Sequence, residues 1–247
     1  MVAGTWVSEG TESRVPTRLE LKLLRGFELC CDGVRTDLPV NVQRLLAFLA
    51  VRGRAQHRHT VAGTLWIDSP EDRAAASLRT ALWRARRVDQ GLITASGGYL
   101  SIGSDVRIDL SGAAVRAREL ASDPPTSVEG VTAPVDFSVE DLLPEWYDDW
   151  VLLERERLRQ IHLHSLEAVA RQLSEAGRHA LAVEAGLAAV AAEPLRESAQ
   201  RVLITVYLAE GNMSEAVRQY DAFAALLYDA LGIAPSEATR QLVAPCR

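Results

Sequence analysis

Hydrophobic and polar positions alternate with a period of two soon after the start of the chain. Leu19, Leu21 and Leu23 alternate with charged or polar neighbours. Residues two apart lie on one face of a strand. The Asp32-Gly33 pair is typical of a tight turn between antiparallel strands. The sequence therefore predicts a small antiparallel sheet between residues 18 and 38.

The pattern then changes to helical spacing. Apolar residues between positions 45 and 49 predict a first helix that ends near Gly53. Asn41 is the expected N-cap of this helix, because its side chain can accept a hydrogen bond from a free backbone N–H. Thr60 is the expected N-cap of a short second helix for the same reason.

A third helix and a hairpin complete this region. Ser69-Pro70-Glu71-Asp72 predicts the start of the helix, with a capping serine, a proline in the first turn and acids near the positive helix end. The helix is expected to run to about Val88. Residues 92–94 and 99–102 predict two strands joined by Ser96-Gly97-Gly98. A sheet, three helices and a terminal hairpin in this order are typical of a winged helix-turn-helix.

Beyond residue 140 the chain has an almost continuous helical pattern with an internal repeat. Residues 176–183 recur as residues 210–217, a shift of 34 residues. This period is typical of tetratricopeptide-like helical hairpins, which place Gly in the turn and Ala where helices cross closely. The sequence therefore predicts a second, all-α helical-repeat domain.

Small polar residues and prolines set the expected boundaries. Residues 1–17 show no periodicity and predict a disordered lead-in, and residues 121–139, rich in Pro and Gly, predict a linker. The expected fold is therefore mixed α+β and then all-α. A winged helix-turn-helix is expected over residues 18–120 and a helical-repeat domain over residues 140–247.

Composition and charge narrow the class of protein. The chain has 247 residues, 48% of them hydrophobic and 24% charged, which excludes a disordered or collagen-like chain. Its apolar runs are too short to cross a bilayer. Three cysteines without metal-ligand spacing suit a reducing cytosol, so we expect a cytoplasmic protein. Residues 14–120 carry a net charge of +6 and residues 121–247 carry −10. The first half therefore suits a polyanion.

The third helix carries an exposed face that suits DNA. At 100° per residue its apolar positions lie on one face, and five arginines with no acid lie on the rest of residues 73–88. A major groove admits one helix, where Arg pairs with guanine and flanking Arg contacts phosphate. The expected DNA-binding residues of this helix are Arg73, Ser77, Arg79, Thr80, Trp83, Arg84, Arg86 and Arg87. The alternative is a solvated face rich in Arg through codon bias, since Lys22 is the single lysine.

Two further contacts are expected beside this helix. The hairpin turn, Ser96, Gly97, Gly98 and Tyr99, can bring backbone N–H groups and a phenol to a phosphate or the minor groove. Thr60 can offer its hydroxyl to a phosphate at a helix N-terminus. An ordinary hairpin turn and an ordinary helix cap remain open as alternatives.

Other chemistry finds no support in the sequence. His57 and His59 alternate, as do His162 and His164, and residues two apart on a helix cannot hold one metal ion. No phosphate-binding loop, nucleophile elbow or zinc-protease motif is present. Residues 145–150 mix acids with aromatic side chains, which indicates a contact segment or a helix start with buried rings. We expect no catalytic residue, no metal and no cofactor.

Several stretches resemble one family. They are Leu21–Phe27, Gln43–Leu46, Ala76–Leu82, Gly97–Leu100, Trp150–Arg157 and Glu193–Glu197. On these stretches the chain resembles the Streptomyces antibiotic regulatory protein (SARP) family, over about residues 18–247. The resemblance implies an OmpR-type winged helix joined to a bacterial transcriptional activation domain of tetratricopeptide hairpins. Trp83 departs from the family, in which a small polar residue is common at that position.

The resemblance also implies a function. Such proteins activate antibiotic gene clusters by binding direct repeats in double-stranded DNA upstream of promoters, as two protomers, and by recruiting RNA polymerase holoenzyme. We therefore expect a nucleoid-associated, non-enzymatic activator with no membrane partner. The competing hypothesis is a helical-repeat scaffold or ligand sensor whose winged helix binds protein. Salt-sensitive DNA binding by the arginine face distinguishes the two.

Overall fold

The computed structural model describes residues 18–110 and 142–246. The expected lead-in at 1–17 and linker at 121–139 lie outside these residues. The chain divides into two compact units: a first unit of Met1–Lys22 with Phe27–Arg107, and a second unit of Leu23–Gly26 with Ile108–Arg247.

A four-stranded sheet begins the first unit, and its alternating residues pack inward as expected. β1 pairs with β2 in antiparallel register, with Leu19 opposite Cys31 and Leu21 opposite Leu29. Leu19, Leu21 and Leu29 are buried. The strand order is β3-β2-β1-β7. The bounds are Leu19–Lys22 for β1, Glu28–Cys31 for β2, Val34–Arg35 for β3 and Val106–Ile108 for β7.

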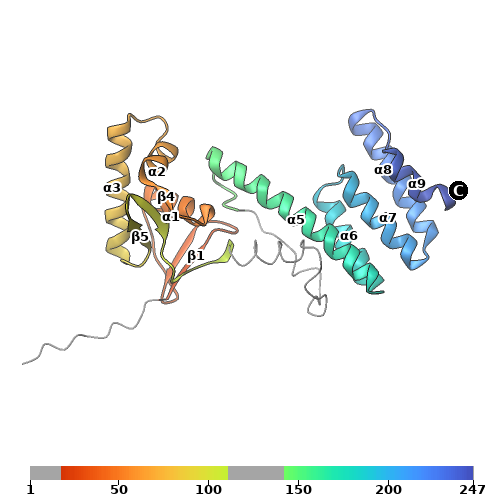
Figure 1. Ribbon diagram of the computed structural model, residues 1–247, viewed down its shortest axis with the longest axis horizontal. Coiled ribbons are helices and arrows are strands. Elements are labelled where there is room, and N and C mark those ends of the chain that lie inside the picture. Colours follow the sequence, from red (N-terminus) through yellow and green to blue (C-terminus); the bar gives the residue numbers. More distant parts are fainter. Residues whose placement is uncertain (1–17, 111–141, 247) are drawn as a thin grey trace, which may run out of the picture. The chain divides into compact units, whose positions relative to one another are not determined.

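Three helices follow, close to the expected bounds. They are α1 (Val40–Arg52), α2 (Arg58–Leu65) and α3 (Glu71–Val88). Gly53 ends α1 in the left-handed conformation, as a C-terminal glycine commonly does. Figure 1 shows α3 at one side of the first unit, with α2 and α1 beside it. Leu78, Leu82 and Ala85 of α3 are buried there.

The expected N-caps of these helices are wrong at all three positions. Pro39 precedes α1 and Pro70 precedes α3, neither with a capping side chain, so Asn41 lies inside α1 and Ser69 lies outside α3. His57 caps α2, and Thr60 lies inside that helix. The acids Glu71 and Asp72 do occupy the first turn of α3. A proline disfavours helical backbone at the residue before it, so α1 and α3 do not extend back past Pro39 and Pro70.

A second, three-stranded sheet carries the terminal hairpin. Its order is β4-β6-β5, with Ser96 opposite Tyr99 at the hairpin end. Gly97 and Gly98 both have positive φ, 54° and 84°, as the two central residues of a type I′ turn require. The bounds are Gln56–His57 for β4, Ile93–Ser96 for β5 and Tyr99–Ile102 for β6. The sequence predicted β5 and β6 but neither β4 nor β7.

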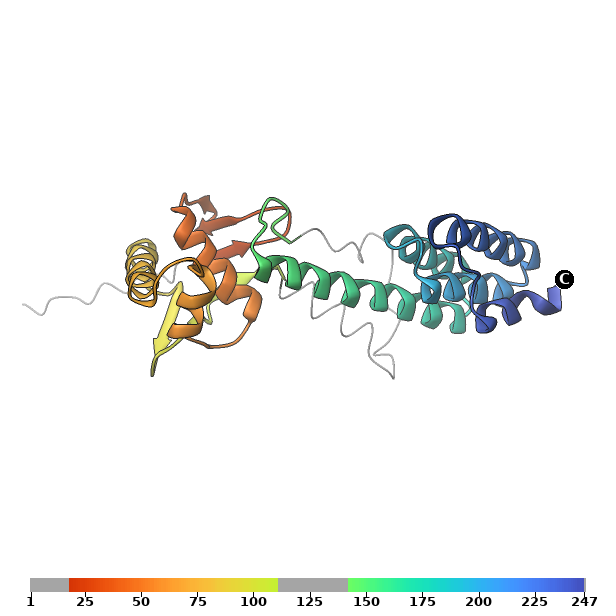
Figure 2. The ribbon, with the colours of Figure 1, turned by 90° about the horizontal axis from the view of Figure 1, so that it is seen from above.

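The described part of the second unit is mainly helical, as expected from its pattern. Both copies of the repeat place a glycine with positive φ, Gly177 and Gly211, between consecutive helices. In Figure 2 the N-terminal part of α5 extends away from α6–α9. The bounds are Asp149–Glu175 for α5, His179–Ala192 for α6, Glu197–Glu210 for α7, Met213–Leu231 for α8 and Glu237–Val243 for α9. A 3₁₀ turn, Ala244–Cys246, follows α9.

Small residues let these helices approach closely. Ala182, Ala185 and Ala189 of α6 are buried in one cluster with residues of α5 and α7. A Cβ atom added at Gly186 of α6 would lie 3.0 Å from Cδ1 of Leu203 in α7, tighter than nearly all real contacts. The expected close crossing at alanine positions is therefore present between α6 and α7.

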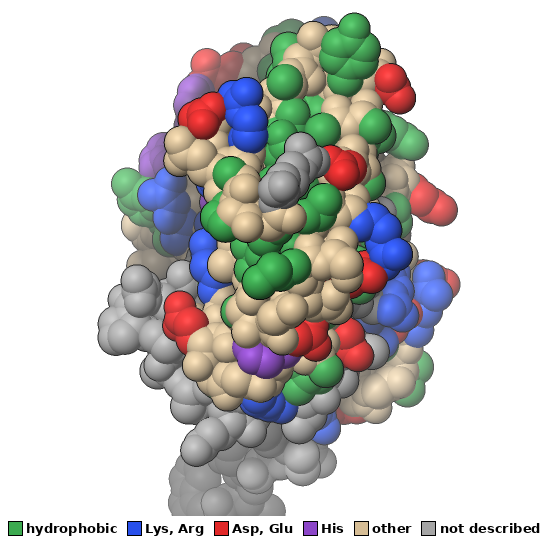
Figure 3. Space-filling model, turned by 90° about the vertical axis from the view of Figure 1, so that its right-hand side faces the viewer, with side chains coloured by type: hydrophobic (Ala, Val, Ile, Leu, Met, Phe, Trp, Pro, Cys, Tyr) green, Lys and Arg blue, Asp and Glu red, His purple; other side chains and the backbone are tan. Residues whose placement is uncertain are grey.

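The end of the second unit carries exposed apolar side chains. A separate core of Ile204, Ala216, Tyr220 and Val243 joins α7, α8 and α9. Figure 3, viewed from the side of α8 and α9, shows hydrophobic side chains gathered over this end. The exposed large apolar residues late in α8 and just after it are Leu226, Tyr228, Leu231 and Ile233.

Candidate nucleic-acid interface

The exposed face of α3 contains the residues that the sequence assigned to it. Arg73, Arg79, Arg84, Arg86 and Arg87 are all exposed. Thr80 and Trp83 are exposed as well, with Trp83 at 57%, whereas Ser77 is half-buried. The helical period therefore separates a buried apolar face from a continuous exposed face, as predicted.

The arginines of this face have no acidic partner among the described residues. None of the five forms an ion pair within residues 18–110 and 142–246, and the acids of α3, Glu71 and Asp72, are confined to its first turn. Unpaired guanidinium groups keep all five N–H donors available for a ligand. The face therefore presents positive charge that the described residues do not neutralise.

Two side chains on this face are oriented by their neighbours. The guanidinium carbon of Arg87 lies over the ring of Trp83, 4.9 Å from its centroid. The Thr80 hydroxyl donates a hydrogen bond to the Ala76 carbonyl, 3.0 Å away. Thr80 thereby uses its hydroxyl proton within the helix, so its methyl group and its oxygen lone pairs are what it can offer a ligand.

The hairpin turn and the start of α2 are joined by backbone pairing. β4 pairs with β6, with His57 opposite Tyr99, and the Arg58 N–H donates to the Gly98 carbonyl at 2.9 Å. The rings of His57 and Tyr99 meet edge to face, 5.3 Å apart. The expected turn residues Ser96, Gly97, Gly98 and Tyr99 are all exposed. The turn therefore lies beside the first residue of α2.

His57 begins α2 in place of Thr60. The His57 Nδ1 accepts a hydrogen bond from the His59 N–H at 3.3 Å, which is the cap that the sequence assigned to Thr60. The chain is extended through β4 up to His57 and becomes helical at Arg58, so Thr60 lies inside the helix and not at its cap. Thr60 is exposed in the first turn of α2, and its proposed phosphate contact does not involve capping.

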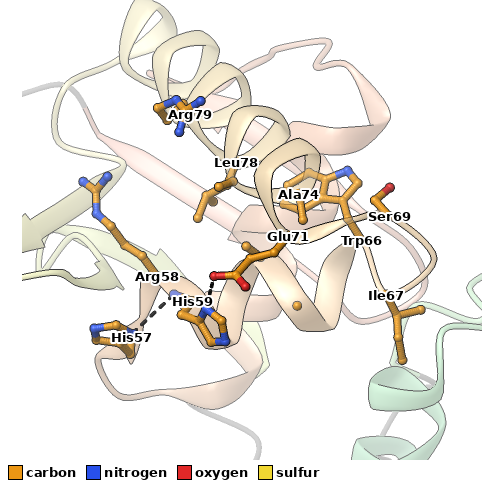
Figure 4. A pocket seen from close by; sticks show the side chains of 13 residues that line it. His57, Arg58, His59, Trp66, Ile67, Ser69, Glu71, Ala74, Leu78 and Arg79 are labelled. Atoms are coloured by element: carbon orange, nitrogen blue, oxygen red, sulfur yellow. Dashed lines mark hydrogen bonds and ion pairs between the residues drawn. The ribbon is translucent and has the colours of Figure 1, made fainter.

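A cavity of about 550 Å³ lies between α2 and α3 (Figure 4). His59 Nδ1 and Glu71 Oε1 lie 3.3 Å apart across it. Arg58 and Arg79 are drawn with their charged ends on the same side of the cavity in Figure 4. The lining residues are His57, Arg58, His59, Ala62, Gly63, Trp66, Ile67, Ser69, Glu71, Ala74, Ala75, Leu78 and Arg79.

Sequence reasoning missed Arg58 and the histidines beside it. Arg58 is half-buried at the start of α2 and reaches the cavity only because β4 sets the position of that helix. A two-residue strand gives no readable period, and its pairing with β6 spans more than forty residues of sequence. The available signal was the local excess of basic residues at 52–59.

The described residues also bear on the other kinds of site that the sequence raised, namely a metal site, a contact segment and a membrane span. No group of three or more His, Cys, Asp or Glu side chains there could hold a metal ion. The acidic aromatic segment at 145–150 leads into α5, which begins at Asp149, with Trp150 buried and Tyr147 79% exposed. The Trp146 and Trp150 rings meet edge to face, 6.4 Å apart. No helix in the part searched has the length and apolar character to span a bilayer.

Sequence comparison finds one family model and two curated relatives. Residues 110–246 match the model of the bacterial transcriptional activator domain. Regulatory protein AfsR of Streptomyces coelicolor is 31% identical over 227 residues, and that of Streptomyces griseus is 28% identical over 221. Each match covers 85% of this chain and 22% of the relative. The chain thus spans about a fifth of the length of these relatives.

A solved structure shares the fold. EmbR of Mycobacterium tuberculosis, in complex with a low-affinity phosphopeptide, matches with a TM-score of 0.68 and 20% sequence identity. The match covers 92% of this chain and 64% of that chain. A small β-rich N-terminal region followed by a helical domain is therefore an arrangement that the two chains have in common.

Proposed function

We propose that this chain is a sequence-specific, DNA-binding transcriptional activator. The chain belongs to the bacterial transcriptional activator domain family, as its resemblance to the SARP family implied. In this proposal residues 18–120 form an OmpR-type winged helix-turn-helix and residues 140–247 form a tetratricopeptide-like activation domain. The protein acts in the cytoplasm on the nucleoid and performs no catalysis of its own.

The observation that carries this proposal is the set of unpaired arginines on α3. A helix that enters a major groove needs outward donors for guanine and cations for phosphate. Arg84 and Arg87 occupy the outward face and are proposed to contact bases. Arg79 and Arg86 lie on its flank and are proposed to contact phosphates. Acids on the same face would repel the backbone, and after the first turn α3 has none.

The elements beside α3 support the same orientation. The hairpin turn is proposed to be the wing, which contacts a phosphate or the minor groove through Ser96, Gly97, Gly98 and Tyr99. Arg58 and Arg79 line one cavity from α2 and α3, and we assign them a shared backbone phosphate. The Arg58 N–H bond to Gly98 connects the wing to this phosphate site.

DNA binding is tested directly by the full-length chain on duplexes selected from a random pool. The expected result is a preferred sequence whose affinity falls steeply as salt rises from about 50 to 200 mM, because bound counterions are released on binding. A chain that selects no sequence and shows no salt-dependent binding would overturn the proposal. That result would favour the reading in which the first unit binds protein.

The acidic half is proposed to contact RNA polymerase holoenzyme. Residues 121–247 carry a net charge of −10, which phosphate would repel, so this half is available to a protein partner. The resemblance to the SARP family suggests antibiotic biosynthesis as the regulated pathway. Transcription in vitro from a promoter with the selected site upstream should rise on adding the protein. DNA binding without any rise would leave a regulator that does not activate.

Two protomers are proposed to bind head to tail on direct repeats. One recognition helix reads only a few base pairs, so discrimination among genomic sites needs two modules on adjacent turns. A head-to-tail contact is heterologous, and an acidic surface beside a basic one suits it. Affinity per site should be higher on two-repeat than on one-repeat DNA. Equal affinity per site would show independent binding.

A further inference from the structure

An aromatic ring lies exposed on the proposed recognition face without a packing reason. Trp83 is 57% exposed, although its side chain is the largest on α3. Arg87, one helical turn later, is held over the ring with its guanidinium carbon 4.9 Å from the centroid. Arg87 has no acidic partner among the described residues. The stack is therefore the one interaction that orients this guanidinium there.

A second stacked arginine among the described residues of the first unit shows what a structural stack looks like. The Arg52 guanidinium carbon lies 5.1 Å from the ring centroid of Phe48. Phe48 is fully buried, so its ring is part of the core independently of its contact with Arg52. The Trp83 ring contributes little to any core, which leaves the orientation of Arg87 as its visible effect.

We infer that Trp83 is a positioning residue that presents the Arg87 guanidinium to a guanine. This inference rests on the proposed function. A ring stacked on a guanidinium occupies one of its faces, whereas bidentate bonds to guanine O6 and N7 use the N–H groups at its edge. Arg87 can therefore keep the ring and bind the base together. A guanidinium held in advance loses less side-chain freedom on binding than a free one.

The charge of Arg87 and its orientation are separable in experiment. Removing Arg87 removes a cation, which should lower both specific affinity and the salt dependence. Replacing Trp83 by leucine leaves every charge in place and removes the aromatic face. Replacing it by phenylalanine keeps an aromatic face. A positioning role therefore predicts a loss of base discrimination without a change of charge-dependent binding.

The test uses the full-length chain and its selected duplex, with each guanine replaced in turn. Arg87→Ala should abolish discrimination at one guanine and lower the salt slope by about one. Trp83→Leu should lower discrimination at the same guanine by about 3- to 30-fold, the range expected of a cation–π contact from exposed to desolvated surroundings. Its salt slope and its affinity for unrelated DNA should match those of the parent, and Trp83→Phe should retain most of the discrimination.

A double variant completes the cycle. Trp83→Leu with Arg87→Ala should discriminate no worse than Arg87→Ala alone, because the ring acts through the arginine. Val34→Ala, which trims another exposed apolar side chain of the first unit, controls for apolar loss. Unfolding temperatures should be equal throughout, since Trp83 is exposed.

The outcomes separate this inference from the function it rests on. A parent chain that selects no duplex contradicts the proposed function. If the parent and Arg87→Ala behave as expected but Trp83→Leu discriminates like the parent, only the positioning role fails. Additive losses in the double variant also overturn it, because they would show that Trp83 contacts DNA independently.

Discussion

The arginines of α3 and those of the second unit have opposite surroundings. On α3 five arginines are exposed without an ion pair in the described residues. In the second unit most arginines bond to a carboxylate or to backbone carbonyls. Arg155, for example, donates to the Leu142 and Trp146 carbonyls at 2.6 and 2.7 Å. The ion-paired arginines there are Arg157, Arg159, Arg171, Arg196, Arg218 and Arg240.

This difference separates composition from function. Lys22 is the one lysine in the sequence, so Arg supplies nearly every positive charge wherever one is needed. A bias in codon use enriches Arg in both regions alike, but it does not decide whether an acid is placed beside each one. The absence of described acidic partners on α3 is therefore more informative than its arginine content.

The largest effect is expected where an arginine serves the fold. Arg196 donates from Nε to Glu167 Oε1 at 2.6 Å, and the Glu167 side chain is only 4% exposed. Arg196→Met removes the closest cation from a buried carboxylate, leaves it only the more distant Arg171 at 4.0 Å, and should lower the free energy of unfolding by about 3 kcal/mol. Chemical denaturation measures this loss. Glu167→Leu in the same chain should recover much of it, and no loss in the single variant would contradict the structural role.

An arginine of α3 should show the reverse behaviour. Arg84→Ala should change the free energy of unfolding by less than about 0.5 kcal/mol, as exposed substitutions do. Its binding to the selected duplex should weaken by about 1–3 kcal/mol, with relaxed base preference at one position. Fluorescence anisotropy on the duplex measures the binding. If Arg84→Ala bound the duplex with the affinity of the parent, this face of α3 would not contact DNA.

The flanking arginines should affect overall DNA affinity and its salt dependence, but not base preference. Arg79→Ala or Arg86→Ala should weaken binding to all sequences equally and reduce the salt slope by about one each. Arg157→Ala is the matched control, because Arg157 pairs with Glu154 in the second unit at 2.9 Å. Its slope should equal that of the parent. A changed slope in the control would mean that the second unit also contacts DNA.

The smallest effect is expected from a histidine, since the exposed histidines of the first unit differ from one in the second unit as the arginines do. His57 and His59 are exposed, whereas burial lowers the pKa of His162 in α5, and its Nδ1 is buried without a hydrogen bond in the described chain. As the pH falls, His162 is therefore protonated in the unfolded chain before it is protonated in the folded one. The folded state consequently loses, below about pH 6.5, stability that it has above this pH. His162→Leu should make the unfolding temperature less pH-dependent below that value. An unchanged profile would exclude His162 as its source.

The sequence predicted what depends on period and missed what depends on pairing. The exposed and buried faces of α3 follow from helical spacing, and the two positive-φ glycines mark the hairpin turn. The start of α2 depends on β4, a two-residue strand that exists only because β6 lies beside it. Arg58 and the cavity were invisible for this reason. The predicted N-caps were wrong because the preference of Asn, Thr and Ser side chains for the cap position is weaker than the constraints from a neighbouring proline or from strand pairing.

The first unit receives and releases the chain through neighbouring strands. β1, its first strand, lies next to β7, its last, in the order β3-β2-β1-β7, and Arg107 of β7 pairs with Glu20 of β1 at 3.7 Å. Two attachment points at one place on a surface let a folded module be spliced into a foreign chain with little distortion of the host. Because Leu23–Gly26 belongs to the second unit, a graft of the first unit beside unrelated partners must carry this short segment with it.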